Sequence, residues 1–138
     1  MGDAADHEGQ PTKHGGVVFR AGEELFFLPA SIAMKISPIP EMARVPGGPL
    51  ELRGVALVGG VMIPVVDVVE GPDAGPAGAM LVCAVLGESV GLVGIEVVAT
   101  GRFEAGEGPG EVKFGDETAR TFDVAAVIAR VREGRWAV

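Results

Sequence analysis

The side chains that most often carry catalysis are few in this sequence, and their spacing does not bring them together. The two histidines, His7 and His14, both fall within the first 15 residues. Cys83 lies in the apolar stretch MLVCAVL, where a cysteine usually behaves as a small buried hydrophobic residue. A thiol nucleophile needs a neighbouring base, and the sequence after residue 15 contains no histidine to serve as one. We therefore expect no cysteine or histidine chemistry in the folded body.

Carboxylates and glycine-rich stretches also lack the patterns of a reactive or ligand-binding site. Asp67 follows a strand-like segment, but a turn or capping role is favoured because no second carboxylate is spaced to act with it. The stretch GEGPG, beginning at Gly106, lacks the strand-to-helix setting of a phosphate-binding loop. An acidic stretch without the spacing of a calcium loop indicates a solvated surface; its members are Glu104, Glu107, Glu111, Asp116 and Glu117.

The sequence therefore predicts no catalytic residue, no metal site and no cofactor. A weak calcium site at the acidic stretch and a metal role for the two histidines are the less favoured alternatives.

Length, composition and charge exclude several classes of function. The 138 residues are 48% hydrophobic and 22% charged, which predicts one folded domain. A net charge of −8 disfavours nucleic acid and anionic membranes, both of which attract basic surfaces. The start, MGDAADHEGQ, lacks the basic and apolar regions of a signal peptide, and the uncharged run at residues 54–66 is too short to cross a membrane. We expect a cytoplasmic protein that neither binds nucleic acid nor inserts into a membrane.

Short valine-rich segments between glycine- and proline-rich turns predict a chain that is mostly β. Gly59 and Gly60 form a two-residue hairpin turn between two strands that are apolar on nearly every residue, so both faces of this ribbon are expected to be buried. Pro64 suggests an edge or a bulge there. Residues 31–36 fit either a helical turn or an irregular strand. The strands are expected at residues 17–19, 25–28, 52–58, 61–69, 80–86 and 89–98, with weaker candidates at 112–114 and 119–122.

The two ends of the chain differ in character. Residues 1–15 are polar and predict a disordered tail, which leaves residues 16–138 as a single domain. Near the other end, Asp123 is a good helix N-cap, and an apolar stripe follows it at Val124, Val127, Ile128 and Val131. Gly134 is a plausible stop for this helix. Trp136 is expected to pack back on the body, with a contact anchor as the alternative.

The order and spacing of several motifs resemble the CheW-like family of chemotaxis coupling proteins. The segment RGVALVGGVMIPVVDV, residues 53–68, is similar to the family's Gly-Val pair, turn and Pro-Val-x-Asp strand. FLPASIAMKISPIPEMARVPGGP upstream, and VGLVGIEVV and TFDVAAVI downstream, resemble further family segments. The resemblance implies an all-β fold of two small SH3-like five-stranded barrels with a short C-terminal helix. It also implies a non-catalytic adaptor with a partner groove between the barrels.

The resemblance implies which residues contact partners, and the departures from the family pattern bear on those contacts. The family's turn arginine falls on Gly59, the preceding asparagine on Leu57, an acidic residue on Lys35 and an aspartate on Ile95. Charges that specify a partner are therefore changed. By resemblance, the partner-binding groove is expected to include Lys35, Ile36, Ile39, Pro40, Gly54, Gly59 and Val97.

Three functional hypotheses follow. The first is an adaptor that couples the cytoplasmic tip of a chemoreceptor to the regulatory domain of a CheA-type histidine kinase. The second is a divergent adaptor that binds a receptor or another signalling protein but not the kinase. The third is an unrelated β-barrel enzyme or ligand carrier, which would require a deep pocket with converging polar groups.

Overall fold

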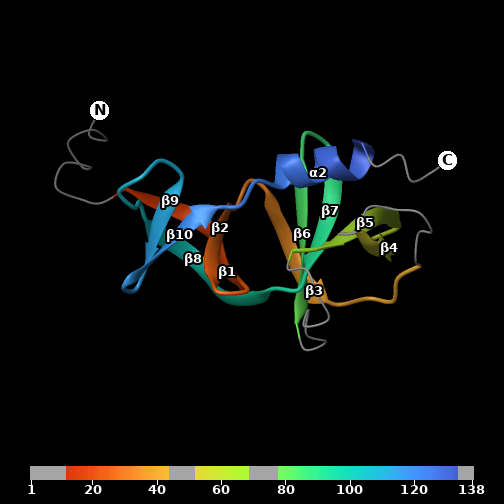
Figure 1. Ribbon diagram of the computed structural model, residues 1–138, viewed down its shortest axis with the longest axis horizontal. Helices are drawn as coiled ribbons and strands as arrows, with labels where there is room; N and C mark the ends of the chain where they lie inside the picture. The colour runs from red at the N-terminus through yellow and green to blue at the C-terminus, as the bar shows by residue number, and fades with distance from the viewer. Residues whose placement is uncertain (1–11, 44–51, 69–77, 134–138) are drawn as a thin grey trace.

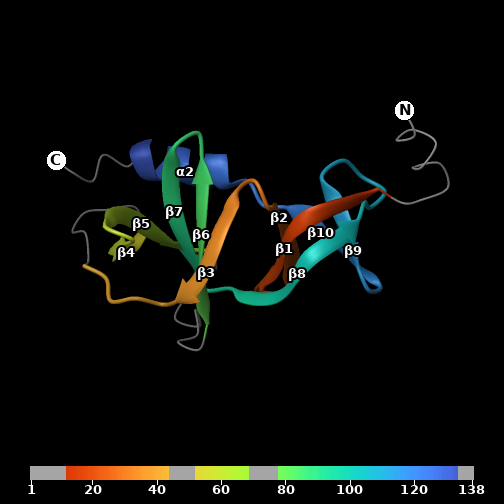
Figure 2. The same ribbon diagram turned by 180° about the vertical axis from the view of Figure 1, so that it is seen from behind.

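The computed structural model describes residues 12–43, 52–68 and 78–133, which form ten strands and one helix. Two β-rich units lie side by side, and the helix packs against two inner strands of the second unit (Figures 1 and 2). The strands are β1 (Lys13–Ala21), β2 (Glu24–Pro29), β3 (Ala33–Pro38), β4 (Leu52–Val58), β5 (Val61–Asp67), β6 (Ala79–Val85), β7 (Glu88–Val93), β8 (Glu96–Glu104), β9 (Glu111–Phe114) and β10 (Glu117–Thr121), and the helix is α2 (Val124–Glu133).

The first sheet combines the start and the end of the chain, in the order β8-β1-β2-β10-β9. β1 pairs antiparallel with β2 and with β8, whereas β10 pairs parallel with β2. Its two edge strands, β8 and β9, approach each other at the Ala105–Val112 bridge. This single bridge brings the edges of the sheet together at one point.

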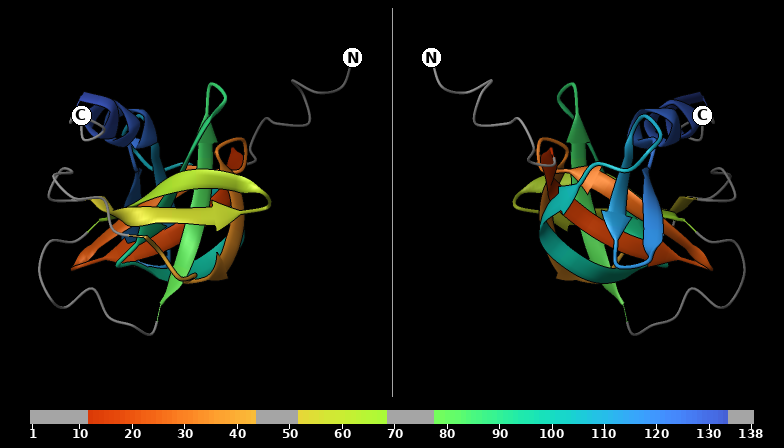
Figure 3. Two further views of the ribbon diagram at one scale, coloured as in Figure 1. Left: turned by 90° about the vertical axis from the view of Figure 1, so that its right-hand side faces the viewer. Right: turned by 90° about the vertical axis from the view of Figure 1, so that its left-hand side faces the viewer.

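The second sheet is built from the middle of the chain, in the order β3-β6-β7-β5-β4. Its edges are β3 and β4, and the segment after β3 crosses to β4, where Ala43 and Val55 exchange two backbone hydrogen bonds of 2.9 Å. The β4–β5 hairpin runs across one end of the molecule (Figure 3, left). The predicted two five-stranded units are therefore confirmed.

One apolar core joins the two sheets. Successive side chains of a strand point to opposite sides, so Val18 and Phe27 enter a cluster within the first sheet, while Phe19 and Leu28 enter the shared core. Leu81 on β6 reaches the same shared core from the second sheet. β1 and β2 are consequently buried on both faces, which explains their unbroken apolar sequences.

The C-terminal helix has the cap and the stripe expected from the sequence. The amide of Ala126 donates a 3.0 Å hydrogen bond to Asp123 Oδ1, so the N-cap prediction is confirmed. Val124, Val127 and Val131 are buried in the shared core, and Ile128 packs at its margin. The helix therefore helps to hold the two sheets together. Gly134 and Trp136 lie outside the described residues.

Several predicted boundaries are wrong, because backbone pairing overrides local composition. Residues 13–15 belong to β1 and not to a tail: Lys13 pairs with Glu104 and Gly15 with Arg102. Residues 1–11 of the predicted tail are outside the described residues. Residues 89–98 are not one strand, since Gly94 at a φ of 76° separates β7 from β8. The alternatives for residues 31–36 resolve toward a strand, β3, which is irregular between Ala33 and Lys35.

Candidate functional site

An exposed apolar surface lies on β3, at the free edge of the second sheet. Ala33 pairs with Cys83 and Lys35 with the neighbouring Val82, so Met34 is an extra residue that bulges from the ladder. Met34 is 60% exposed and Ile36 is 43% exposed. We call Met34, Lys35 and Ile36 the β3 edge surface. Two of the predicted groove residues, Lys35 and Ile36, belong to it, whereas Met34 was not expected.

The segment after β3 places two more predicted residues beside this surface. Ile39 packs against the apolar cluster inside the second sheet, and Pro40 follows it half-buried. The backbone then reaches β4 at Ala43, directly over Gly54. A Cβ at Gly54 would lie 2.6 Å from the Ala43 carbonyl oxygen and 3.2 Å from Met42 Cβ. Gly54 is buried, so it permits this close approach and offers no side chain to a partner.

Gly59 and Val97 occupy different surroundings from these five residues. Gly59 has a φ of 57° in the turn of the β4–β5 hairpin, and a Cβ there would meet open space. Val97 lies on β8 of the first sheet, half-buried against the shared core. Five of the seven predicted residues therefore follow one path along β3, the next segment and β4, while Gly59 lies in the hairpin turn and Val97 on the other sheet.

The β4–β5 hairpin exposes apolar side chains that were expected to be buried. Leu57 and Met62 lie directly opposite each other and are 64% and 58% exposed, and Val61 is 58% exposed. The expectation that both faces of the ribbon are buried is wrong at its turn end, where Ala56 and Ile63 enter a core on one face and Leu57 and Met62 are exposed on the other. It holds at the far end of β5, where Val65 and Val66 enter different cores. We call Leu57, Val61 and Met62 the hairpin surface.

The position of Pro64 agrees with its sequence prediction. Only the last three residues of β5, Val65 to Asp67, pair with β7. Within the described part of the chain, Pro64 comes before them and pairs with β4 alone, so the first half of β5 has a free edge on its other side. A groove of about 350 Å³ begins there and runs between the hairpin and α2, with Met62, Pro64, Ile128 and Val131 in its lining.

Asp67 forms an ion pair that the sequence did not predict. Arg53 Nε donates to Asp67 Oδ2 at 2.7 Å, and Arg53 Nη2 donates to Oδ1 at 2.6 Å. These hydrogen bonds raise the pKa of the Arg53 guanidinium above its ordinary value. The pair joins the start of β4 to the end of β5 beside a register shift between Leu52 and Gly54. The predicted turn or capping role of Asp67 is replaced by a structural ion pair, which depends on residues 14 apart in sequence.

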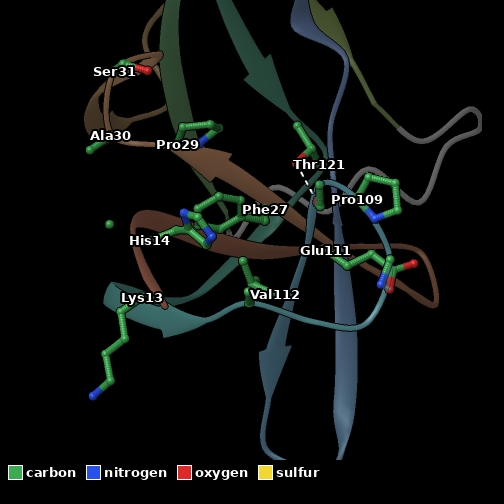
Figure 4. A pocket seen from close by; sticks show the side chains of 14 residues that line it. Lys13, His14, Phe27, Pro29, Ala30, Ser31, Pro109, Glu111, Val112 and Thr121 are labelled. Carbon is green, nitrogen blue, oxygen red and sulfur yellow. Dashed lines mark hydrogen bonds between the residues drawn. The ribbon is translucent and has the colours of Figure 1, made fainter. Parts of the chain in front are cut away.

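A larger hollow, of about 670 Å³, opens at the end of the first sheet (Figure 4). Two of its polar side chains bond to neighbouring backbone: Thr121 Oγ1 donates to the Gly110 carbonyl at 2.6 Å, and Glu111 Oε1 accepts from the Gly108 amide at 3.0 Å. His14 and Ser31 lie at separate corners of the hollow in Figure 4. A nucleophile and a base are therefore not paired within it, and its lining does not converge on a ligand as the third hypothesis requires.

Cys83 is enclosed in the shared core. Burial raises the pKa of its thiol to about 12, because a thiolate would lose its hydration there. Its predicted role as a small buried hydrophobic residue is confirmed. Across residues 12–43, 52–68 and 78–133, no group of three histidine, cysteine, aspartate or glutamate side chains is placed to hold a metal ion. Nor does this part of the chain contain a helix long and apolar enough to span a bilayer.

Comparison with known proteins agrees with the architecture. The model of the CheW-like domain family matches residues 15–105. Among solved structures, the scaffolding protein TtCheW from Thermoanaerobacter tengcongensis resembles this chain with a TM-score of 0.63. The likeness covers 81% of this chain and 90% of the other at 18% sequence identity, and bears on the fold alone. No curated protein matches the sequence.

Proposed function

This chain belongs to the CheW-like domain family, and from that premise we propose that it couples chemoreceptors to a CheA-type histidine kinase. Domains of this family are non-catalytic scaffolds of chemotaxis signalling, so the protein is an adaptor and not an enzyme. The proposal places it in the cytoplasm, where receptor tips and kinases meet. Signal would pass through the geometry of the complex and not through a reaction on this chain.

The receptor contact is proposed for the β3 edge surface and the adjoining Ile39 and Pro40. The observation that carries it is the exposure of Met34 and Ile36 beside the segment that follows β3. The cytoplasmic tip of a chemoreceptor is a helical hairpin, and helices dock through apolar side chains spaced along one face. Two exposed apolar side chains on a rigid strand provide such a contact.

The kinase contact is proposed for the hairpin surface at the end of the second sheet. This hairpin lies at the edge of the sheet and exposes Leu57, Val61 and Met62. On the outer side of β4, the described backbone contact is the bridge between Val55 and Ala43. An edge strand with apolar side chains favours packing against another β-domain. The kinase regulatory domain, which the family resemblance implies to be homologous to the adaptor, has this character.

A divergent adaptor that lacks the kinase contact is the second candidate, and two residues favour it. The hairpin turn at Gly59 carries no charge, where the family pattern has an arginine, and Lys35 replaces an acidic residue. Both changes alter charge complementarity, which affects partner choice more than raw affinity. This candidate predicts binding to a receptor tip without binding to the kinase regulatory domain.

Binding measurements with two purified partners from the same organism test both candidates. Met34→Ser with Ile36→Ser should weaken binding to the receptor tip by at least about tenfold, because each partly exposed side chain forfeits about 1 kcal/mol of apolar burial. Leu57→Ser with Met62→Ser should weaken kinase binding comparably. Leu86→Asn is the matched control, since Leu86 is fully exposed in the β6–β7 turn. Equal affinity of all variants for both partners would contradict the assignment of surfaces.

Affinity capture from the native cells, followed by mass spectrometry, separates the candidates in their natural setting. Recovery of a chemoreceptor together with a histidine kinase supports the coupling adaptor. Recovery of the receptor alone supports the divergent adaptor. Recovery of neither contradicts the role in chemosensory coupling.

A further inference from the structure

The two edge strands of the first sheet separate beyond the point where they meet. Between β8 and β9, the described backbone contacts are the Ala105–Val112 bridge and the 2.7 Å hydrogen bond from the Gly106 amide to the Glu111 carbonyl. Past this point lies a hollow of about 370 Å³. We call it the β8–β9 slot; it is lined by Lys13 of β1, by Arg102, Phe103 and Glu104 of β8, and by Lys113, Phe114 and Gly115 of β9 and its turn.

The charge of the slot is opposite to that of the chain. Lys13, Arg102 and Lys113 line it with a single carboxylate, Glu104, although the protein has a net charge of −8. These three cations are exposed, and none forms an ion pair among the described residues. By contrast, Arg20, Arg53, Arg120 and Arg132 are each paired with a carboxylate. Three of the four such cations in the described part of the chain are thus gathered where the sheet opens, and the fourth, Lys35, lies on the β3 edge surface.

The slot also has an aromatic floor and unpaired strand edges. Phe103 and Phe114 are half-buried with ring centroids 6.3 Å apart, and Phe103 stacks edge-on against Phe27 at 6.1 Å. Edge strands present backbone groups that can pair with an added strand. A small inorganic anion would use the cations but neither the rings nor the strand edges.

We infer that the β8–β9 slot binds an acidic, extended segment of a partner protein. Its carboxylates would contact Lys13, Arg102 and Lys113, its alternate apolar side chains would lie on Phe103 and Phe114, and its backbone would pair with a strand edge. β9, which contributes to the slot, lies at the opposite end of the molecule from the β4–β5 hairpin (Figure 1). This binding can therefore occur together with the contacts proposed above and is independent of them.

A fluorescein-labelled decapeptide of alternating glutamate and valine is the probe, with binding to the full-length protein followed by fluorescence anisotropy. Lys13→Gln, Arg102→Gln and Lys113→Gln together should weaken binding at least about tenfold, since three charge-assisted contacts are lost. The matched control is Arg20→Gln, Arg120→Gln and Arg132→Gln, which removes the same charge elsewhere and should bind like the wild type. Raising the salt from about 50 to about 500 mM should weaken wild-type binding about tenfold or more. Melting temperatures of all variants establish that each is folded.

Three results would overturn the inference. The first is equal binding by the slot variant and the control, or by a peptide with glutamine in place of glutamate. The second is displacement of the peptide by about 1 mM inorganic phosphate at constant ionic strength, which would indicate a small-anion site. The third is peptide binding only after Asp3→Asn, Asp6→Asn and Glu8→Gln, which would make this chain's own acidic residues the occupant in place of a partner.

Discussion

Gly54→Ala tests whether a predicted partner-binding residue acts through position and not through contact. The added methyl would lie 2.6 Å from the Ala43 carbonyl oxygen, which is shorter than a van der Waals contact. Because this oxygen belongs to the backbone, a side-chain rotation cannot relieve the clash. The segment that carries Ile39 and Ala43 must therefore move, and the two 2.9 Å hydrogen bonds between Ala43 and Val55 lengthen or break. We expect a loss of receptor binding even though the partner cannot touch the buried Gly54.

The expected loss of stability in Gly54→Ala follows from the two hydrogen bonds between Ala43 and Val55. Each contributes about 0.5 to 1.5 kcal/mol, so their loss costs about 1 to 3 kcal/mol. Restricting the unfolded chain by replacing glycine offsets about 0.4 to 1 kcal/mol. The free energy of unfolding should fall by about 1 to 2 kcal/mol, measured by urea denaturation with an unchanged slope. Hydrogen exchange should accelerate at the amides of Ala43 and Val55.

Gly15→Ala is the matched control for Gly54→Ala. Gly15 also lies in a strand, but the nearest atom to an added Cβ, the Gly101 carbonyl oxygen, is 3.8 Å away. This variant should be as stable as the wild type or slightly more stable. If Gly54→Ala behaved like Gly15→Ala in stability and in exchange at Ala43, the positional role of Gly54 would be wrong.

Further predictions concern single interactions. Asp123→Ala should lower the free energy of unfolding by about 1 kcal/mol, and Asp123→Ser should restore most of it, as urea titration would show. Asp67→Asn should cost about 1 kcal/mol, because it weakens a partly exposed bidentate pair with Arg53, and an Arg53→Gln, Asp67→Asn double-mutant cycle measures the coupling. The neutral Cys83 thiol is favoured in the folded state, so its contribution is full below the unfolded pKa of about 8.5 and is lost as pH rises toward about 12. Unfolding titrations above pH 9 should therefore show a decline that Cys83→Ala reduces, and a thiol reagent at pH 8 should react with Cys83 only in denaturant. Leu86→Asn should raise stability by about 1 kcal/mol, since Leu86 has a φ of 53° in a turn followed by Gly87; an unchanged melting temperature would contradict the strain at this position.

Much of the secondary structure could be predicted from residues that are close in sequence. The Gly59-Gly60 turn, the N-cap at Asp123 and the valine-rich strands each depend on residues close in sequence, and the structure has each of them. The absence of a histidine near Cys83 in sequence was also readable without a structure. The family was indicated by several motifs that occur in the family's order and at its spacing along most of the chain.

The partner surfaces were less accessible to sequence reasoning. Met34 and Leu57 look like core residues in a list of hydrophobic side chains, and only sheet order reveals that β3 and β4 are edges. The single available signal was the lack of alternation in the β4–β5 ribbon, which was interpreted as burial on both faces. The family resemblance grouped Gly54 with Ile39 and Pro40 in one partner groove, but its role in admitting Ala43 required the distance to a carbonyl oxygen.

The sequence by itself determined the strands, the turns, the helix cap and the family, since these depend on short-range conformational preferences and ordered spacing. Tertiary structure alone decided which apolar residues stay exposed, that Asp67 pairs with Arg53, and that Lys13, Arg102 and Lys113 gather at one opening. The physical reason is that exposure and charge pairing depend on residues brought together by sheet closure, such as β1 beside β8, whose paired residues are 76 to 91 positions apart. The pairing of β1 with β8 cannot be predicted from residues that are close in sequence.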